Sequence, residues 1–239
     1  MLTLPFEITP ERPTQLGLIV LQADETIEAD MRRLLPDTVE LLASRVPSGT
    51  HVTPESLAAM EAELQRAASL FPAGAKLAAV GYGCTSGSAT IGATRVTDAV
   101  KAGIPTPHVT EPVSALIATC RAKGIKRLGL LSPYIASVSE RLIDVLKDAD
   151  IEVCAFGSFD EAEEWRVVRI APASIKAAAI AVHDQVQMDA LFISCTNLRT
   201  LDIIGKIEAQ IGCPVLTSNQ VLAWDMLRLA GQASPIIAK

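Results

Sequence analysis

The chain has 239 residues, of which 49% are hydrophobic and 4% aromatic, and its formal net charge is −6. An acidic chain without a Lys/Arg cluster is a poor nucleic-acid binder, and no apolar run approaches the roughly 20 residues that span a bilayer, so neither partner is expected. The N-terminus lacks a secretory pattern and the five cysteines form no C-x-x-C pair, so we expect a cytoplasmic protein with free thiols and no metal site.

Apolar runs that predict buried strands alternate along the chain with segments that predict helices. The first strand is expected at 16–21, and a helix is expected over 54–70. The next strand, 77–83, leads into Cys84 and then into a helix that ends near Gly103. Strands that alternate with helices in this way predict a parallel sheet with right-handed crossovers.

Three short motifs of the first half recur in the second half at nearly the same spacing. They pair Leu16-Gly17-Leu18 with Leu128-Gly129-Leu130, Cys84-Thr85 with Cys195-Thr196, and Gly103-Ile104-Pro105 with Gly212-Cys213-Pro214. The repeat predicts an α/β fold of two similar Rossmann-like lobes, 1–113 and 114–222, related by pseudo-twofold symmetry. The active site is expected in the cleft between them. The tail, 223–239, is expected to pack on the first lobe.

The two Cys-Thr steps are the candidate catalytic positions, because each follows a predicted buried strand and is expected to precede a helix. Backbone N–H groups and the helix dipole should lower the thiol pKa of Cys84 and Cys195 from about 8.5 and favour the thiolate. The alternative is that both are small buried core residues. Their symmetric positions favour chemistry.

Short polar side chains beside both cysteines are candidates for binding a substrate carboxylate. Thr85 and Ser86 follow the first cysteine, and Thr196 and Asn197 follow the second. The three other thiols, Cys120, Cys154 and Cys213, are expected to be structural. The glycine-rich fragment 81–87 lacks a P-loop lysine and a G-x-G-x-x-G pattern, so no nucleotide cofactor is expected.

The duplicated Cys-Thr pattern resembles the aspartate/glutamate racemase superfamily, in particular the branch of maleate cis–trans isomerases and arylmalonate decarboxylases. The resemblance covers nearly the whole chain and is carried by Leu16-Gly17-Leu18-Ile19-Val20, Ala23-Asp24-Glu25-Thr26, Cys84-Thr85-Ser86, Ser132-Pro133-Tyr134 and Ser194-Cys195-Thr196-Asn197. It implies an enzyme that needs no cofactor and binds a small carboxylate between two lobes. It also implies that Tyr134 orients a substrate carboxylate or stabilises enolate-like charge.

Two comparisons with this branch bear on the substrate. Its decarboxylases have glycine at the first cysteine position, so the presence of both Cys84 and Cys195 favours racemisation or isomerisation. Its maleate isomerases have Asn at the position of Asp24 and near that of Glu164, so both acids are expected to bind substrate. An ionised Asp24 would repel a dicarboxylate and hold an ammonium or amide N–H group.

The predicted function is therefore racemisation or epimerisation of an amino- or acylamino-acid. One thiolate would remove the α-proton and the opposite thiol would return one. In this respect the chain resembles racemase-like proteins associated with ectoine utilisation. The alternatives are maleate cis–trans isomerisation through addition of Cys84 to the double bond, decarboxylation of the arylmalonate type, and non-catalytic binding of a small carboxylate. Assembly into a homo-oligomer is compatible with the sequence.

Overall fold

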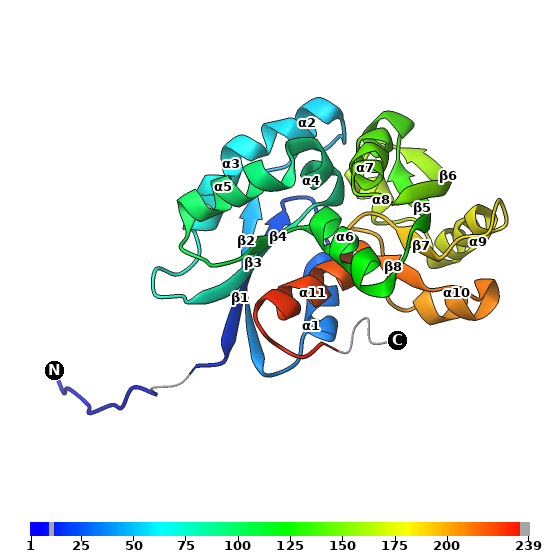
Figure 1. Cartoon of the computed structure of the whole chain (residues 1–239). Coiled ribbons are helices and arrows are strands. Elements are labelled where there is room, and N and C mark those ends of the chain that lie inside the picture. Colours follow the sequence, from blue (N-terminus) through cyan, green and yellow to red (C-terminus); the bar gives the residue numbers. More distant parts are fainter. Residues whose placement is uncertain (10–11, 235–239) are drawn as a thin grey trace.

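The computed structural model describes residues 1–9 and 12–234, which fold into two packed α/β halves with an extended N-terminal arm (Figure 1). The last part of the tail, 235–239, lies outside the described residues. Within the described ranges, no helix is both long enough and apolar enough to cross a membrane.

The first half is built around a parallel four-stranded sheet in the order β2-β1-β3-β4. Its elements are β1 (Thr14–Leu21), α1 (Ile27–Leu34), β2 (Val39–Val46), α2 (Pro54–Ala59), α3 (Glu61–Ser69), β3 (Leu77–Gly83), α4 (Thr85–Ile91), α5 (Ala93–Gly103) and β4 (Val109–Thr110). The apolar run predicted at 77–83 coincides with β3.

The second half repeats this plan with the strand order β6-β5-β7-β8, again parallel throughout. Its elements are α6 (Pro112–Lys123), β5 (Arg127–Tyr134), α7 (Ala136–Asp148), β6 (Glu152–Glu161), α8 (Glu164–Val167), α9 (Pro172–His183), β7 (Ala190–Ile193), α10 (Ile204–Ile211), β8 (Val215–Thr217) and α11 (Ser218–Leu229). Two similar lobes with parallel sheets, as the repeat predicts, are thereby confirmed.

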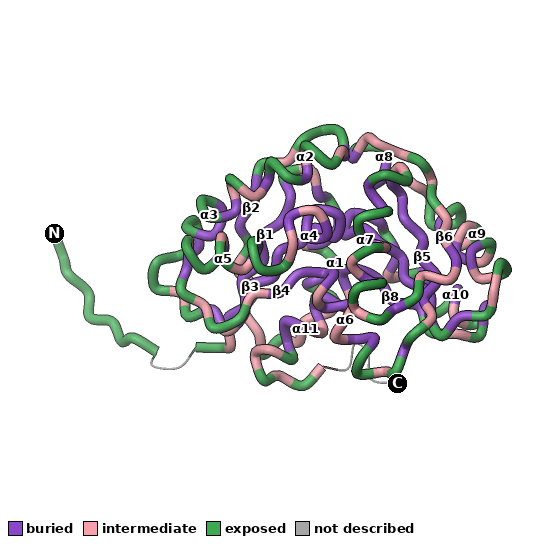
Figure 2. Tube along the Cα trace, turned by 45° about the horizontal axis from the view of Figure 1, so that its top comes forward, coloured by how far each residue is buried: buried purple, intermediate pink, exposed green. Residues whose placement is uncertain are grey.

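Both sheets are covered by helices on both faces, which is why their central strands are buried along nearly their whole length (Figure 2). In the first sheet, one face packs against α2, α3 and α5, and the other against α1 and α11. The last helix, α11, packs closely on β3. A Cβ added at Gly81 of β3 would lie only 2.6 Å from the sulfur of Met226 on α11.

Two long helices expected from the sequence are each interrupted. The segment 54–70 divides at Met60 into α2 and α3, and the Tyr82 hydroxyl lies 3.7 Å from the sulfur of Met60 at this break. The helix after Cys84 divides at Gly92, whose φ of +92° is incompatible with a continuing right-handed helix.

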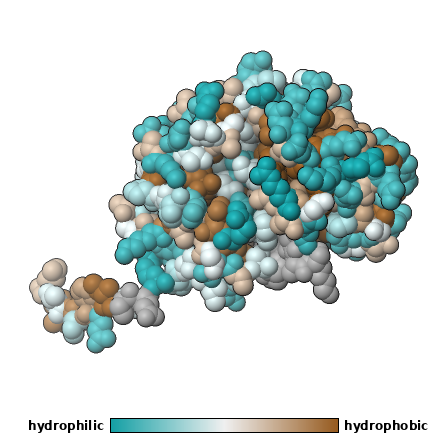
Figure 3. Space-filling model, in the orientation of Figure 1, coloured by the Kyte–Doolittle hydropathy of each residue, from teal (hydrophilic) through white to brown (hydrophobic). Residues whose placement is uncertain are grey.

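The N-terminal arm runs away from the folded body (Figure 3). Its apolar side chains Leu2, Leu4, Phe6 and Ile8 are all exposed. The arm therefore contributes nothing to the two cores or to the pocket described next.

Candidate active site

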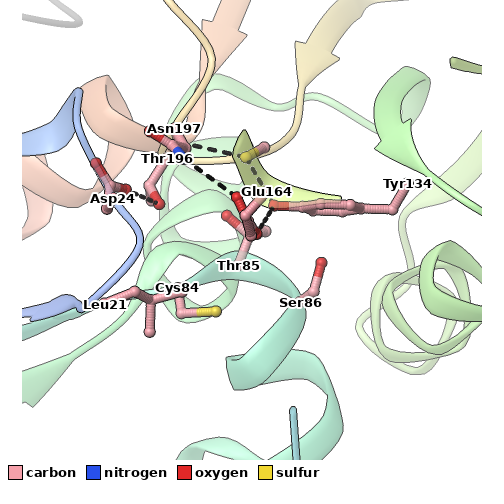
Figure 4. A pocket seen from close by; sticks show the side chains of 10 residues that line it. Leu21, Asp24, Cys84, Thr85, Ser86, Tyr134, Glu164, Thr196 and Asn197 are labelled. Atoms are coloured by element: carbon pink, nitrogen blue, oxygen red, sulfur yellow. Dashed lines mark hydrogen bonds between the residues drawn. The ribbon is translucent and has the colours of Figure 1, made fainter. Parts of the chain in front are cut away.

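A nearly closed pocket lies between the two halves, beyond the carboxyl ends of β1, β3, β5 and β7 (Figure 4). It is lined by Leu21, Asp24, Cys84, Thr85, Ser86, Tyr134, Glu164, Cys195, Thr196 and Asn197. All nine residues predicted as site residues therefore lie together. Its cavity volume of about 10 Å³ leaves room for about one water molecule, so a substrate can enter only if the walls move.

Leu21 is the pocket residue that the sequence analysis does not identify. It is the last residue of β1. Its position at the carboxyl end of a strand, where open α/β sheets bind ligands, is the pattern that could have identified it.

Cys84 is placed by the turn from β3 into α4. It is the N-cap residue of α4, and its sulfur accepts the N–H of Gly87 at 3.1 Å. A Cβ at Gly87 would lie 2.8 Å from that sulfur and 2.7 Å from the hydroxyl of Tyr82. Glycine at this position therefore lets the helix backbone approach the thiol.

Cys195 is placed differently, and the expectation of a helix directly after it is wrong. The chain turns after β7, and the next helix, α10, begins only at Ile204. Cys195 has a φ of +100°, a conformation that costs a non-glycine residue of order 1–3 kcal/mol and is concentrated at functional sites. Its sulfur lies 3.0 Å from the hydroxyl oxygen of Tyr134 and accepts the N–H of Asn197 at 3.3 Å.

The expectation that both thiols have a lowered pKa is also wrong. Burial is the largest cause that raises the pKa of Cys84 to about 12, and the charge of Glu164 adds to this, while the Gly87 N–H acts in the opposite direction. Burial and the Glu164 charge likewise raise the pKa of Cys195 well above its usual value. In the closed pocket, loss of water around the sulfurs therefore outweighs the stabilisation by backbone N–H groups.

Asp24 both lines the pocket and fixes the start of α1. Its Oδ1 accepts the N–H groups of Thr26 and Ile27, each at 2.8 Å, and its Oδ2 accepts the Thr196 hydroxyl at 2.8 Å. Burial raises the pKa of Asp24, and these three donors oppose the increase. Both oxygens of the Asp24 carboxylate thus already accept hydrogen bonds from other residues of the chain.

Glu164 enters the pocket from the first residue of α8 and is 6% exposed. Its Oε1 accepts the hydroxyl of Tyr134 at 2.7 Å, and its Oε2 accepts the side-chain amide of Asn197 at 3.1 Å. Figure 4 shows Glu164 between these two donors. Burial raises the pKa of Glu164, and both hydrogen bonds oppose that increase.

The four short polar side chains predicted to bind a carboxylate are mostly engaged already. The hydroxyl of Thr85 donates to Ser218, that of Thr196 donates to Asp24, and the amide of Asn197 donates to Glu164 and to the Ala23 carbonyl. Only the hydroxyl of Ser86 has no hydrogen-bond partner among residues 1–9 and 12–234. Substrate binding by these residues stays a prediction.

Ser218, the first residue of α11, connects the two Cys-Thr steps. Its Oγ accepts the Thr85 hydroxyl at 2.8 Å and the backbone N–H of Cys195 at 3.0 Å. No sequence motif marks this residue. Its place directly after the short strand β8 is the one feature that could have indicated a site position.

The raised pKa of Cys84 predicts how its reactivity depends on pH. Because the thiolate is the reactive form, alkylation of Cys84 by iodoacetamide should increase about tenfold per pH unit and continue to increase beyond pH 9. Glu164→Gln removes a charge that raises this pKa, so it should accelerate alkylation at a fixed pH. Peptide mass spectrometry would follow Cys84 itself, and a plateau near pH 8.5 in the wild type would contradict the expected direction.

Comparison with known proteins finds relatives that are named for decarboxylation or isomerisation of small carboxylates. A family model described as arylmalonate decarboxylase matches residues 16–238. The arylmalonate decarboxylase of Bordetella bronchiseptica is 30% identical over 221 residues, covering 90% of each chain. A maleate isomerase of Nocardia farcinica is 28% identical over 226 residues, covering 90% of this chain and 89% of the relative.

A solved structure shows the same fold. It is the Nocardia farcinica maleate cis–trans isomerase C194S mutant with a covalently bound succinylcysteine intermediate, with a TM-score of 0.83 and 23% identity, covering 95% of this chain and 98% of the other. The predicted resemblance to this branch is confirmed, and the named relatives are enzymes rather than binding proteins. They favour isomerisation or decarboxylation over the amino-acid racemisation expected first.

Proposed function

Because the chain belongs to the arylmalonate decarboxylase family, we propose that it is a cofactor-independent cis–trans isomerase of a small α,β-unsaturated carboxylate of the maleate type. The observation that carries the proposal is that two cysteines, Cys84 and Cys195, line one closed pocket. The resemblance described in the sequence analysis implies glycine at the position of Cys84 in the decarboxylases of this branch. The presence of a thiol there supports isomerisation over decarboxylation.

In the closed pocket burial raises the pKa of Cys84 to about 12 and keeps it protonated, so in the proposed reaction it first loses its proton to water while the walls are open for the substrate. The resulting thiolate then adds to one carbon of the double bond. The S–C bond forms as the π bond breaks, and the electron pair moves to the neighbouring carbon, where the adjacent carboxylate delocalises it as an enediolate. Rotation about the former double bond and loss of the thiolate then restore the double bond in the trans form. The succinylcysteine of the Nocardia relative is an adduct of this type.

Cys195, with Tyr134 beside it, is suited to donate a proton to the neighbouring carbon and to take it back. The Tyr134 hydroxyl oxygen lies 3.0 Å from the Cys195 sulfur. A thiol whose pKa is raised by burial keeps its proton at neutral pH and can lend it to a carbanion that forms beside it. The same proton returns to Cys195 before the product is released, so the reaction consumes no net proton.

Racemisation of an amino- or acylamino-acid is the second candidate. It is favoured by the two acids in the pocket, because Glu164 could accept a substrate N–H group and the negative charge of Asp24 disfavours a second carboxylate. In this scheme Cys84 and Cys195 would exchange the α-proton from opposite faces.

The two candidates give different products in heavy water. A panel of cis-enoates, including maleate and its monoamide, would be followed by proton NMR alongside amino- and acylamino-acids. Appearance of the trans-alkene supports isomerisation, and deuterium exchange at Cα with loss of optical rotation supports racemisation.

A Cys195→Ala variant gives a second measurement. Incubated with a cis-enoate, it should accumulate an adduct on Cys84, which intact-mass and peptide mass spectrometry would detect as the added mass of one substrate. The Cys84→Ala variant is the matched control and should remain unmodified. Isomerisation without any requirement for Cys84 would contradict the proposed addition step.

A further inference from the structure

The wall of the pocket formed by the second half contains hydrogen-bond acceptors where a dicarboxylate would need donors. Tyr134 has a single O–H, and it is donated to Glu164. The amide of Asn197 has two N–H bonds, and they are donated to Glu164 and the Ala23 carbonyl. The Thr196 hydroxyl donates to Asp24. A ligand group that reaches this wall therefore meets carboxylate oxygens.

Glu164 is held in this position by its backbone as well as by its side chain. The residues just before it pair with the loop after β2: His51 and Glu163 form an antiparallel bridge, and the Val52 N–H donates to the Ala162 carbonyl at 2.8 Å. The Glu164 N–H itself reaches the Thr50 carbonyl at 3.4 Å. These contacts join the two halves across the pocket and fix α8 with its carboxylate directed inward.

The opposite wall of the pocket, formed by α4, offers a hydrogen-bond donor instead of acceptors. The Ser86 hydroxyl, in the first turn of α4, is free to donate within the described part of the chain, and Figure 4 shows it projecting from α4 toward Tyr134. Among residues 1–9 and 12–234, no Lys or Arg lines the pocket to balance a second carboxylate of a ligand. Two buried anions facing each other without such a partner repel strongly in a medium of low polarity.

From this arrangement we infer that the substrate is asymmetric, with one carboxylate and, at the other end, a hydrogen-bond donor such as a carboxamide that Glu164 accepts. The inference rests on the proposed function, whose substrate class it narrows to a monoamide of a cis-enedioic acid. Glu164 is then the residue that determines specificity. A carboxylate has about four acceptor sites. Asp24 already accepts three donors, from Thr26, Ile27 and Thr196, and therefore acts on the site mainly through its charge. Glu164 accepts only two donors, one on each oxygen, and so keeps a free acceptor site on both.

Saturated analogues test the inference separately from the chemistry. Succinamate and succinate differ only in amide against carboxylate, and neither has a double bond to isomerise. By isothermal calorimetry, the wild type should bind succinamate at least about tenfold more tightly, which corresponds to one hydrogen bond to a charged acceptor gained or lost. The same preference should appear in kcat/KM for the cis monoamide over maleate.

Glu164→Gln supplies the matched variant, because the glutamine amide can donate to a carboxylate. It should reduce the amide preference by about tenfold or more, mainly through tighter succinate binding. Asp24→Asn removes a charge from the same pocket without altering the group that faces the ligand, so it should change the preference much less.

Three results would overturn the inference: equal binding of the two analogues by the wild type, an unchanged preference in Glu164→Gln, or an equal change in Asp24→Asn. The last would show a general charge effect in place of a specific contact. Amide-selective binding without turnover of any cis-enoate would support the inference and reject the proposed isomerase. Turnover of maleate and its monoamide at equal kcat/KM would support the proposed isomerase and reject the inference of amide selectivity.

Discussion

Replacement of Cys84 or Cys195 by alanine is expected to lower kcat/KM by at least about 10³-fold in each single variant, because neither thiol can perform the other's step. Cys84 lies at the N-cap of α4 and Cys195 in the turn after β7, so each reaches the pocket from a different half. Both are buried, and alanine leaves only a small cavity at each position. The loss should therefore appear in turnover while the circular dichroism spectrum stays native.

Cys120→Ala is the control for loss of a buried thiol. Cys120 lies within α6 in a core that does not line the pocket. Burial raises its pKa to about 12, as for Cys84, so chemical reactivity alone does not distinguish the two positions. The control should cost stability and leave kcat/KM within about threefold. If either pocket variant kept more than a tenth of wild-type activity, the two-thiol scheme would be wrong.

Gly103→Ala is expected to lower the free energy of unfolding by about 2–3 kcal/mol, because there is no space for a methyl group at the end of α5. An added Cβ would lie 2.3 Å from the backbone oxygen of Gln65 and 2.7 Å from the Cβ of Ala68, both on α3. Since the closest atom belongs to the backbone, no side-chain rotation relieves the contact, and the two helices must separate.

Gly74→Ala is the matched control, because a Cβ at Gly74 meets no atom of the described residues within 4 Å. It should change the free energy of unfolding by less than about 0.5 kcal/mol. Urea denaturation followed by circular dichroism would compare the two variants with the wild type. A Gly103→Ala variant as stable as Gly74→Ala would mean that α3 and α5 are not packed as tightly as described.

The sequence was sufficient for the features that depend on local pattern and on the repeat. The apolar run 77–83 predicts β3 with its bounds, and the recurrence of Cys84-Thr85 as Cys195-Thr196 predicts two lobes whose cysteines share a pocket. Both predictions succeed because a buried strand gives a continuous apolar run in the sequence, and a duplicated fold gives motifs that recur at a constant spacing.

Features that depend on the tertiary environment could not be predicted in this way. The N–H of Gly87 near Cys84 indicates a lowered pKa, but burial of the whole pocket reverses the direction. The residues after Cys195 form no helix, because Asn197 instead accepts the Glu25 N–H and donates to Ala23 in the other half. Such pairings join residues that are far apart in the sequence and have no local pattern.

The packing of α11 on the first sheet affects how the protein is made. Leu222, Ala223 and Met226 of this helix cover the face that includes Leu16 and Leu18 of β1. On the ribosome, α11 emerges after all the strands of the described residues, so until then this face of the first sheet is covered only by α1, through Ile27 and Met31. The part of this face that α11 covers therefore stays open to other apolar partners, chaperones among them, until that helix has been synthesised.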